Sequence, residues 1–323
     1  MLGILAGLVF IIAGLSAMFH LELGFSLALV LVFAGAAVVL VALFGFRIRT
    51  WDLALFIVGL IILVNVVGLD YYQNNRYSTS SYSVGSQYVQ VPKINIMANS
   101  AFGSIDVHFS TNTDLAYQVV FQNSFFGFPF FNYASNSSLT NQTRNDVFYL
   151  NASSQGSITI TIGINYMVNI NATTGVGSIN FVSPPGTEAN IQSVSLETGA
   201  GSVDVQINSA NISGISLKTG TGSINFVSNY LDASTSAVPI YINSGAGSAN
   251  VNMKITNDAA VQIDATSGLG SLTQHLTGFT VSTNSNNHLV ASSGNIETAA
   301  RSFLVTVSVG TGATDISVQL IPH

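Results

Sequence analysis

The sequence predicts an N-terminal anchor of three transmembrane helices and an all-β extracellular domain, a β-solenoid of repeats about 21–25 residues long. Three observations support this fold class. Residues 1–69 consist almost entirely of three apolar runs separated by charged residues. From residue 92 onward, apolar and polar residues alternate with the period of two that is typical of β-strands. In the same region, a glycine followed by such a stretch recurs at a nearly constant interval, which is typical of repeat architectures.

The three apolar runs cover roughly residues 2–18, 24–46 and 53–69. A spanning helix needs about 20 residues, within a range of roughly 17–25, and each run falls in this range. We therefore expect three membrane-spanning helices in residues 1–69, in contact with membrane lipid. A cleaved signal peptide is the alternative for the first run, but a signal peptide would have a basic start, and no Lys or Arg precedes Arg47.

The orientation of the anchor follows from Arg47 and Arg49, which lie between the second and third runs. Basic residues near the ends of spanning helices are found mainly on the cytoplasmic side of the membrane. The loop with these two arginines is therefore predicted to be cytoplasmic, as is the N-terminus. The C-terminal domain is then extracellular, in a protein of the cell membrane and cell surface.

Charged residues are rare across the whole chain. They make up 7% of the sequence, against roughly 25% in ordinary soluble proteins. Eight basic residues against fourteen acidic ones exclude a basic protein that binds nucleic acid. The lack of cysteine excludes disulfides, thiolate metal sites and cysteine nucleophiles. From residue 71 on there are only six basic and eleven acidic residues, so we expect an exposed surface solvated by Asn, Ser and Thr.

Composition divides the extracellular part of the chain. Residues 70–91 are rich in Ser, Tyr, Asn and Gln, which predicts a polar stalk. Residues 92–323 follow as the β domain. This domain has an aromatic-rich insertion near residues 118–150, in the one long gap between repeat glycines.

Residues 194–207 illustrate the predicted repeat, with an alternating stretch, a Gly-x-Gly turn and a second alternating stretch. Side chains of a strand alternate between two faces, so one face of this unit is apolar and the other polar. The apolar face contains Val194, Leu196, Val203, Val205 and Ile207. One unit buries too little apolar surface to be stable alone, so stacked units are expected to share a continuous core.

Glycine marks the turn of each repeat, because it adopts positive φ without steric cost. The repeat turns are predicted at Gly103, Gly156, Gly177, Gly201, Gly222, Gly247 and Gly270, with weaker copies at Gly294 and Gly312. A phosphate-binding loop would need a helix after the glycines, but strands follow. A β-propeller would need about 40–45 residues per blade, and an immunoglobulin-like sandwich would not repeat one corner so regularly.

The third residue after each glycine argues against a calcium ladder of the β-roll type, whose repeats place an Asp near the turn. Its occupants are mixed: Asp106, Asp204 and Asp315, Asn180, Asn225 and Asn250, and Thr159. This position is therefore expected to lie on the polar face of a strand.

The repeated pattern hydrophobic-x-hydrophobic-x-Thr-Gly-x-Gly-Ser-hydrophobic-Asp/Asn-hydrophobic resembles that of the adhesin, or toast-rack, β-solenoid domains over roughly residues 92–320. The apolar N-terminal segment resembles the multi-helix anchors of Lia-type cell-envelope stress regulators, which join such helices to a similar β domain. The resemblance implies the toast-rack fold and no shared catalytic residues. The low charge and the many Asn, Ser and Thr residues differ from the bacterial members and resemble exported surface proteins of thermoacidophilic archaea.

Five Asn-x-Ser/Thr sequons are candidate N-glycosylation sites, because all lie on the side predicted to be extracellular. They are Asn136, Asn141, Asn151, Asn171 and Asn211. Attached glycans would add the solubility that the few charges do not provide.

Residues 121–133 hold seven aromatic side chains that form a candidate surface. They are Phe121, Phe125, Phe126, Phe128, Phe130, Phe131 and Tyr133. Two interpretations remain open. The segment either caps an open end of the solenoid and protects it from edge-to-edge association, or it is an exposed patch that binds a protein, a membrane or another copy of the chain.

No site for chemistry can be singled out from the residues, so we expect no enzyme activity and no cofactor. The histidines share no metal-ligand spacing, and the acidic residues of the β domain are scattered singly. The leading hypothesis is a non-enzymatic, membrane-anchored surface protein for adhesion, partner binding or self-assembly, with a glycan, an envelope protein or another copy of itself as partner. The alternatives are an envelope-stress sensor or regulatory membrane subunit, and a structural component of the envelope.

Overall fold

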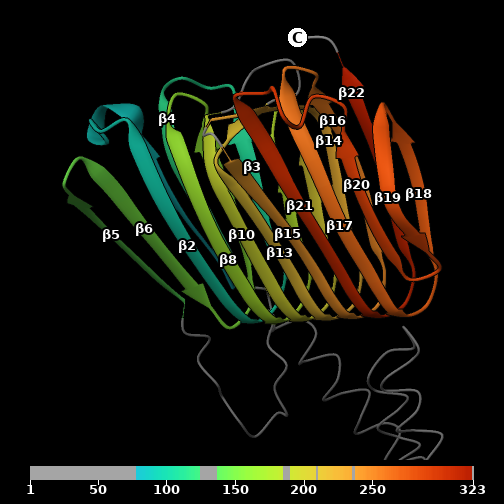
Figure 1. Ribbon diagram of the computed structural model, residues 1–323. Coiled ribbons are helices and arrows are strands. Elements are labelled where there is room, and N and C mark those ends of the chain that lie inside the picture. Colours follow the sequence, from blue (N-terminus) through green and yellow to red (C-terminus); the bar gives the residue numbers. More distant parts are fainter. Residues whose placement is uncertain (1–77, 124–136, 185–189, 209, 235–236, 322–323) are drawn as a thin grey trace, which may run out of the picture. The chain divides into compact units, whose positions relative to one another are not determined.

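The computed structural model describes residues 78–123, 137–184, 190–208, 210–234 and 237–321 (Figure 1). Over these residues the chain is all-β, and its only helical element is the short 3-10 turn η1 (Ser86–Tyr88). No helix within these ranges is long and apolar enough to cross a membrane. The three predicted spanning helices, with Arg47 and Arg49, lie outside the described residues.

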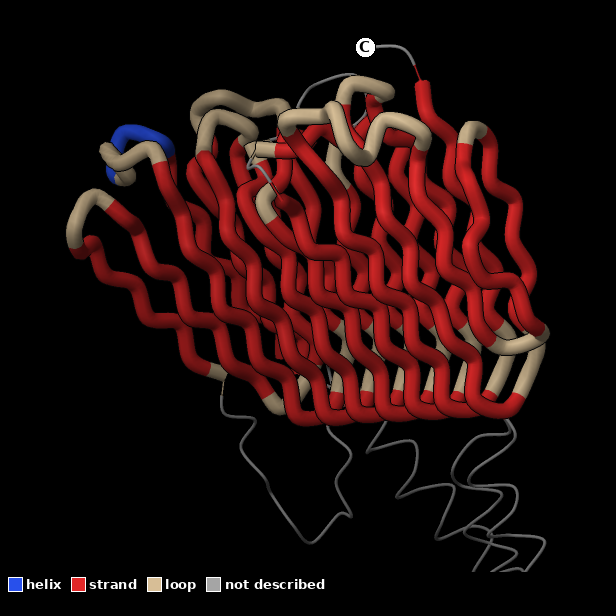
Figure 2. Tube along the Cα trace, viewed as in Figure 1, coloured by secondary structure: helices blue, strands red, loops and turns tan. Residues whose placement is uncertain are grey.

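The strands form two sheets of eleven strands each, sheet A and sheet B, which lie face to face as two layers (Figures 1 and 2). Sheet A contains β1 (Ser78–Gly85), β3 (Ile105–Ser110), β4 (Leu115–Asn123), β7 (Ser157–Gly163), β9 (Ile179–Val182), β11 (Val203–Ile207), β12 (Ala210–Ile212), β14 (Ile224–Ala233), β16 (Ala249–Thr256), β18 (Leu272–Thr277) and β22 (Thr314–Ile321). Sheet B contains β2 (Lys93–Phe102), β5 (Ser138–Arg144), β6 (Val147–Ser154), β8 (Met167–Val176), β10 (Ile191–Ala200), β13 (Gly214–Thr221), β15 (Ala237–Ala246), β17 (Ala259–Leu269), β19 (Phe279–Ser285), β20 (His288–Ser293) and β21 (Arg301–Thr311).

Each repeat contributes one strand to each sheet. A strand of sheet B ends at a glycine corner, and the next strand continues in sheet A, as in β10, Gly201 and β11. Neighbouring repeats pair in parallel in both sheets: β10 with β8 and β13, and β11 with β9 and β14. The glycine corners line one edge of the domain, along the bottom of Figure 1, and we call it the corner edge. The loops that lead back from sheet A to sheet B line the opposite edge, the loop edge.

The spatial order of the repeats differs from their order in the chain at both ends of the stack. The β2–β3 repeat lies between β6–β7 and β8–β9, and the β21–β22 repeat lies between β15–β16 and β17–β18. Antiparallel strands extend the ends: β4 and β1 beyond β7, β5 beyond β6, and β20 and β19 beyond β17. These antiparallel additions cover part of the open strand edges of the stack.

The core lies between the sheets and follows the alternation of the sequence. Val194 and Leu196 of β10 and Val203, Val205 and Ile207 of β11 were predicted to share one face, and each is at most 2% exposed. Burying such a side chain contributes about 1.5–3 kcal/mol to stability. Because every repeat supplies inward side chains from both of its strands, one continuous core runs through the stack.

The predicted boundaries of the β domain differ from the structure. Residues 78–88 of the predicted stalk form β1 and η1, and β1 pairs with β4 at the end of sheet A. The polar composition misled the prediction, because an edge strand needs backbone pairing more than an apolar face. Tyr82 packs edge-on against Phe121, with ring centroids 6.0 Å apart, and Val84 packs against the core. Likewise, the predicted insertion near residues 118–150 supplies β5, most of β4 and the start of β6, so it is part of both sheets.

The predicted repeat turns occupy the corner edge. Gly103, Gly177, Gly201, Gly222, Gly247, Gly270 and Gly312 have φ between 135° and 159°, and Gly156 lies between β6 and β7. Gly294 differs from the prediction: it follows β20 at the loop edge and forms no corner between the sheets.

A buried hydroxyl precedes most of the corners, a feature that the sequence analysis missed. Each hydroxyl donates a hydrogen bond of 2.8–3.0 Å to a glycine carbonyl of the neighbouring repeat. The donor and acceptor pairs are Ser100 and Gly156, Thr174 and Gly103, Thr198 and Gly177, Thr219 and Gly201, Ser244 and Gly222, and Ser267 and Gly312. Val309, which is buried, occupies this position in the β21–β22 repeat. We call this series the hydroxyl ladder.

Candidate binding face

The outer face of sheet A carries a row of carboxylate and amide side chains. Because neighbouring strands pair in parallel, the third residue after each corner glycine lies beside its counterpart in the next repeat. The row runs Asp106, Asn180, Asp204, Asn225, Asn250 and Asp315. Adjacent strands lie about 4.8 Å apart, so the row is a regular array of polar groups. We call it the Asp/Asn row.

Amide hydrogen bonds hold parts of this face together. In the Asp/Asn row, Asn250 Nδ2 donates to Asn225 Oδ1 over 3.3 Å. Nearer the loop edge, Asn229 Nδ2 and Gln206 Nε2 donate to Asn208 Oδ1 over 2.9 and 3.2 Å. The backbone N–H of Asn208 in turn donates to Ser183 Oγ over 2.8 Å. These contacts limit the rotamers of the exposed amides, so the face is partly preorganised.

Two adjoining hollows lie on the same face. The first has a volume of about 260 Å³ and crosses the Asp/Asn row; it is lined by Asn180, Val182, Asp204, Val205, Gln206, Asn225 and Val227. The second, of about 370 Å³, lies nearer the loop edge and is lined by His108, Phe109, Ser110, Thr111, Val182, Ser183 and Pro184. Val182 lines both hollows. Together they combine carboxylate, amide, hydroxyl and imidazole groups with apolar side chains, of which Phe109 is the largest.

The charge of this face comes from Asp106, Asp204 and Asp315 of the row, and it is partly balanced by Lys254 of β16. In parallel register, Asp106 and Asp204 flank Asn180 from either side, two strands apart. No group of three or more His, Cys, Asp or Glu residues that could hold a metal ion occurs in the described part of the chain. The face therefore offers hydrogen bonding and weak negative charge.

Four of the five sequon asparagines lie in the described strands, and all four are exposed. They are Asn141 in β5, Asn151 in β6, Asn171 in β8 and Asn211 in β12; Asn136 lies outside the described residues. Asn151 and Asn171 both pair with Met97, so they sit two strands apart on the outer face of sheet B. Asn141 differs, because its Nδ2, the atom that a glycan would modify, donates to the Tyr117 hydroxyl over 2.9 Å.

Phe121 of the aromatic segment belongs to the core. It lies in β4 and is fully buried, so it contributes to no surface. Its alternation with the polar neighbours Gln118 and Gln122 along β4 is the signal that could have shown this. Phe125, Phe126, Phe128, Phe130, Phe131 and Tyr133 lie outside the described residues.

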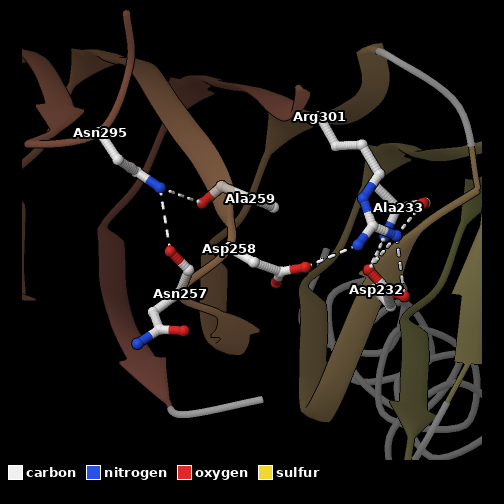
Figure 3. A network of polar contacts seen from close by, with 7 residues as sticks. All are labelled: Asp232, Ala233, Asn257, Asp258, Ala259, Asn295 and Arg301. Carbon is white, nitrogen blue, oxygen red and sulfur yellow. Dashed lines mark hydrogen bonds and ion pairs between the residues drawn. The ribbon is translucent and has the colours of Figure 1, made fainter. Parts of the chain in front are cut away.

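At the loop edge, Arg301 at the start of β21 joins the end of β14 to the turn between β16 and β17, a contact that was not predicted from the sequence (Figure 3). Its Nη1 lies 2.9 and 3.0 Å from the two carboxylate oxygens of Asp232 and donates to Ala233 O over 3.0 Å. Its Nη2 lies 2.6 Å from Asp258 Oδ2. Burial tends to lower the pKa of Arg301, but the two carboxylates outweigh it and the pKa is raised. The cluster is a structural tie between loops.

No family model matches this chain, and no curated protein matches it. Among solved structures, one similar protein is a "putative cell adhesion protein" from Clostridium sporogenes, 16% identical with a TM-score of 0.45, which covers 76% of this chain and 100% of its own. Another is a "putative adhesin" from Parabacteroides distasonis, 8% identical with a TM-score of 0.25, which covers 75% of this chain and 98% of its own. Both likenesses are distant in sequence.

Proposed function

We propose that this protein is a non-enzymatic, membrane-anchored protein of the cell surface whose β domain adheres to envelope glycans through the outer face of sheet A. The observation that carries the proposal is the in-register Asp/Asn row beside the two hollows. In the same proposal, the stacked repeats are a β-solenoid of the toast-rack type. The three apolar runs of residues 1–69 anchor it, with the N-terminus cytoplasmic and the β domain extracellular.

The chemistry of the face suits a hydroxyl-rich ligand. Carboxylates accept hydrogen bonds, and amides both donate and accept them, which matches the hydroxyl groups of a glycan. Val182 and Val227, which pair with Gln206 from either side, provide methyl groups for the C–H surfaces of a sugar. Because the sheet fixes the spacing of the row, little order has to be gained on binding.

The sparse charge of the domain also supports a surface role. With amides and hydroxyls in place of ion pairs, adhesion would depend little on ionic strength, since salt screens charges and leaves neutral hydrogen bonds nearly unaffected. Exposed sequons at Asn151, Asn171 and Asn211 are consistent with glycosylation of this domain on the extracellular side.

A pair of charge reversals in one repeat tests the binding face. Asp204→Lys places an ammonium group in the Asp/Asn row, at the wall of the first hollow. Glu197→Lys makes the same change on the outer face of sheet B, in the same repeat. Cells that display the full chain are allowed to adhere to immobilised polysaccharide from their own envelope. We expect D204K to weaken adhesion at least about tenfold and E197K to leave it unchanged.

The two variants must first be shown to have equal thermal unfolding temperatures, so that a loss of adhesion is a loss of binding. Equal adhesion of both variants and the unmodified protein would contradict the proposed face. Equal weakening by both variants would assign adhesion to net charge and not to sheet A.

A further inference from the structure

The corner edge carries a single file of uncharged side chains, which are exposed except for the half-buried Ala200. They are the middle residues of the Gly-x-Gly corners and their equivalents, and they lie side by side in parallel register. In spatial order they are Phe102, Val176, Ala200, Thr221, Ala246, Thr311 and Leu269. The large apolar members stand out from the surface: Phe102 is 69% exposed, Val176 51% and Leu269 74%. We call this file the corner row.

The corner segments themselves carry no charge. The corner segments 100–104, 154–157, 174–178, 198–202, 219–223, 244–248, 267–271 and 309–313 contain no Asp, Glu, Lys or Arg. The charged residues nearest to the corners are three or four positions from the corner row in the sequence: Asp106, Glu197, Asp204, Lys218 and Asp315. At or near the loop edge lie Lys93, Asp114, Arg144, Asp146, Asp232, Asp258, Glu297 and Arg301. The corner row therefore lies on an edge whose own residues are uncharged.

The strands that lead to the most apolar parts of the sequence end at the corner edge. Ser78, the first residue of β1, pairs with Asn123, the last residue of β4. Near that end, Gln122 pairs with Ser157, which directly follows the corner at Gly156. Ser138, the first residue of β5, pairs with Ser153, close to the same corner. The sequence before Ser78 contains the three predicted spanning runs, and six aromatic residues stand between Asn123 and Ser138.

We propose that the corner row rests on the lipid surface of the membrane that the protein is anchored in. This inference depends on the membrane anchor of the proposed function and adds which edge of the β domain faces the bilayer. An uncharged edge loses little hydration at a lipid surface, and Phe, Val and Leu side chains enter the headgroup boundary favourably. A charged edge in the same place would have to be desolvated.

Contact through the corner row sets the strands upright on the membrane. The strands of a repeat are up to about ten residues long, so the loop edge stands about 33 Å above the lipid surface. Both outer sheet faces, including the Asp/Asn row, then point sideways and stay open to a ligand. The carboxylates of the row also stay clear of the bilayer.

The lack of cysteine permits a direct test with single-cysteine variants of the full chain. Ala246→Cys places a thiol in the middle of the corner row, and Thr113→Cys places one at the loop edge; both positions are exposed. Each thiol is labelled with the environment-sensitive fluorophore NBD, and the protein is reconstituted in phosphatidylcholine vesicles with or without a lipid-attached quencher. We expect the quencher to reduce emission at position 246 at least about threefold more than at position 113.

Equal quenching at the two positions, in protein that sediments with the vesicles, would overturn the inference and leave the anchor intact. Protein that fails to sediment with the vesicles would overturn both the anchor and this inference. A third outcome is that neither aqueous iodide nor the lipid quencher reaches the label at position 246. The corner row would then be covered by a second copy of the chain, and the inferred contact with lipid would be overturned. Adding Leu269→Lys to the A246C variant is expected to halve the difference in quenching, because it places a charge at the end of the row.

Discussion

At the scale of single residues, the close approach of the neighbouring backbone requires both glycines of a Gly-x-Gly corner, and the second glycine is also required by its φ. Gly201 has a φ of 144°, a backbone conformation that side chains disfavour. Gly199 has no such φ, but a Cβ added there would lie 2.5 Å from the carbonyl oxygen of Gly175 in the neighbouring repeat. This close approach, which applies to both glycines, arises only from stacking. The sequence could therefore predict a tight turn, but not that the repeats approach backbone to backbone.

Two glycine-to-alanine variants test whether the close approach of the neighbouring backbone requires glycine. Gly199→Ala is expected to destabilise the domain by at least about 3 kcal/mol, because its Cβ meets a backbone atom that cannot move aside alone. Gly294→Ala is the matched control, since a Cβ there meets nothing within 4 Å. Denaturant unfolding of both variants gives the two changes in free energy. A loss below about 0.5 kcal/mol in G199A would contradict the packing argument.

The hydroxyl ladder predicts a stabilising substitution. Val309 aligns with Ser244 and Ser267 but has no hydroxyl, although Gly247 O is placed as the acceptor of the neighbouring repeat. Val309→Thr should add a buried hydrogen bond worth about 1 kcal/mol, which raises the unfolding temperature by about 2–4 °C in a domain of this size. The reverse change, Thr198→Val, should lower it by a similar amount. If the unfolding temperature fell in both variants, the buried hydroxyls would contribute no net stability, which would contradict this prediction.

At the scale of elements, the parallel pairing of equivalent strands can be predicted from the sequence. The order of the repeats at the two ends of the stack cannot. The repeat period and the alternating residues of β10 and β11 identify equivalent strands, so their parallel register is predictable. Periodicity carries no information about which repeat lies beside which, and β21 lies between β15 and β17 although β19 and β20 come before it in the chain. For the same reason, the Asp/Asn row was recognisable as a set of equivalent positions, but its continuity across six strands needed the register.

Arg301 helps to hold β21 in its place between β15 and β17. It binds Asp232 and Asp258, which are 69 and 43 positions away in the sequence. Arg301→Gln leaves the Asp232 and Asp258 carboxylates without their partner. Because the Arg301 side chain is 34% exposed, solvent screens the loss, and we expect a cost of about 1 kcal/mol. Hydrogen exchange should quicken in the loops around residues 233 and 258. Arg144→Gln, at an exposed turn, is the control and should change neither quantity; equal exchange in both variants would contradict the tie.

At the scale of the whole molecule, the buried tyrosines of the described residues determine how stability depends on pH. Their raised pKa values predict that the folded state loses stability in alkali. Burial raises the pKa of Tyr117, which a hydrogen bond from Asn141 lowers in part, and burial also raises the pKa of Tyr166. In the unfolded chain the tyrosine pKa is about 10, and in the folded state it is higher. The contribution of the two neutral tyrosines to stability is therefore fully present below pH 10 and is lost as the pH rises through the folded pKa values.

The unfolding temperature should therefore hold steady up to about pH 10 and fall above it. A variant with both Tyr117→Phe and Tyr166→Phe should fall less steeply, because neither ring can ionise. Thermal unfolding followed by circular dichroism between pH 7 and pH 12 measures both curves. Parallel curves above pH 10 would show that other groups cause the loss.

The central claim is that sheet A presents its outer face on the cell surface, and labelling of intact cells tests it most directly. In a chain without cysteine, Asn250→Cys in the Asp/Asn row and Thr50→Cys in the predicted cytoplasmic loop each provide a single thiol. Cells are treated with a membrane-impermeant maleimide before and after permeabilisation. We expect Cys at position 250 to be labelled in intact cells and Cys at position 50 to be labelled only after permeabilisation. Labelling at position 250 only after the membrane is opened would contradict the account.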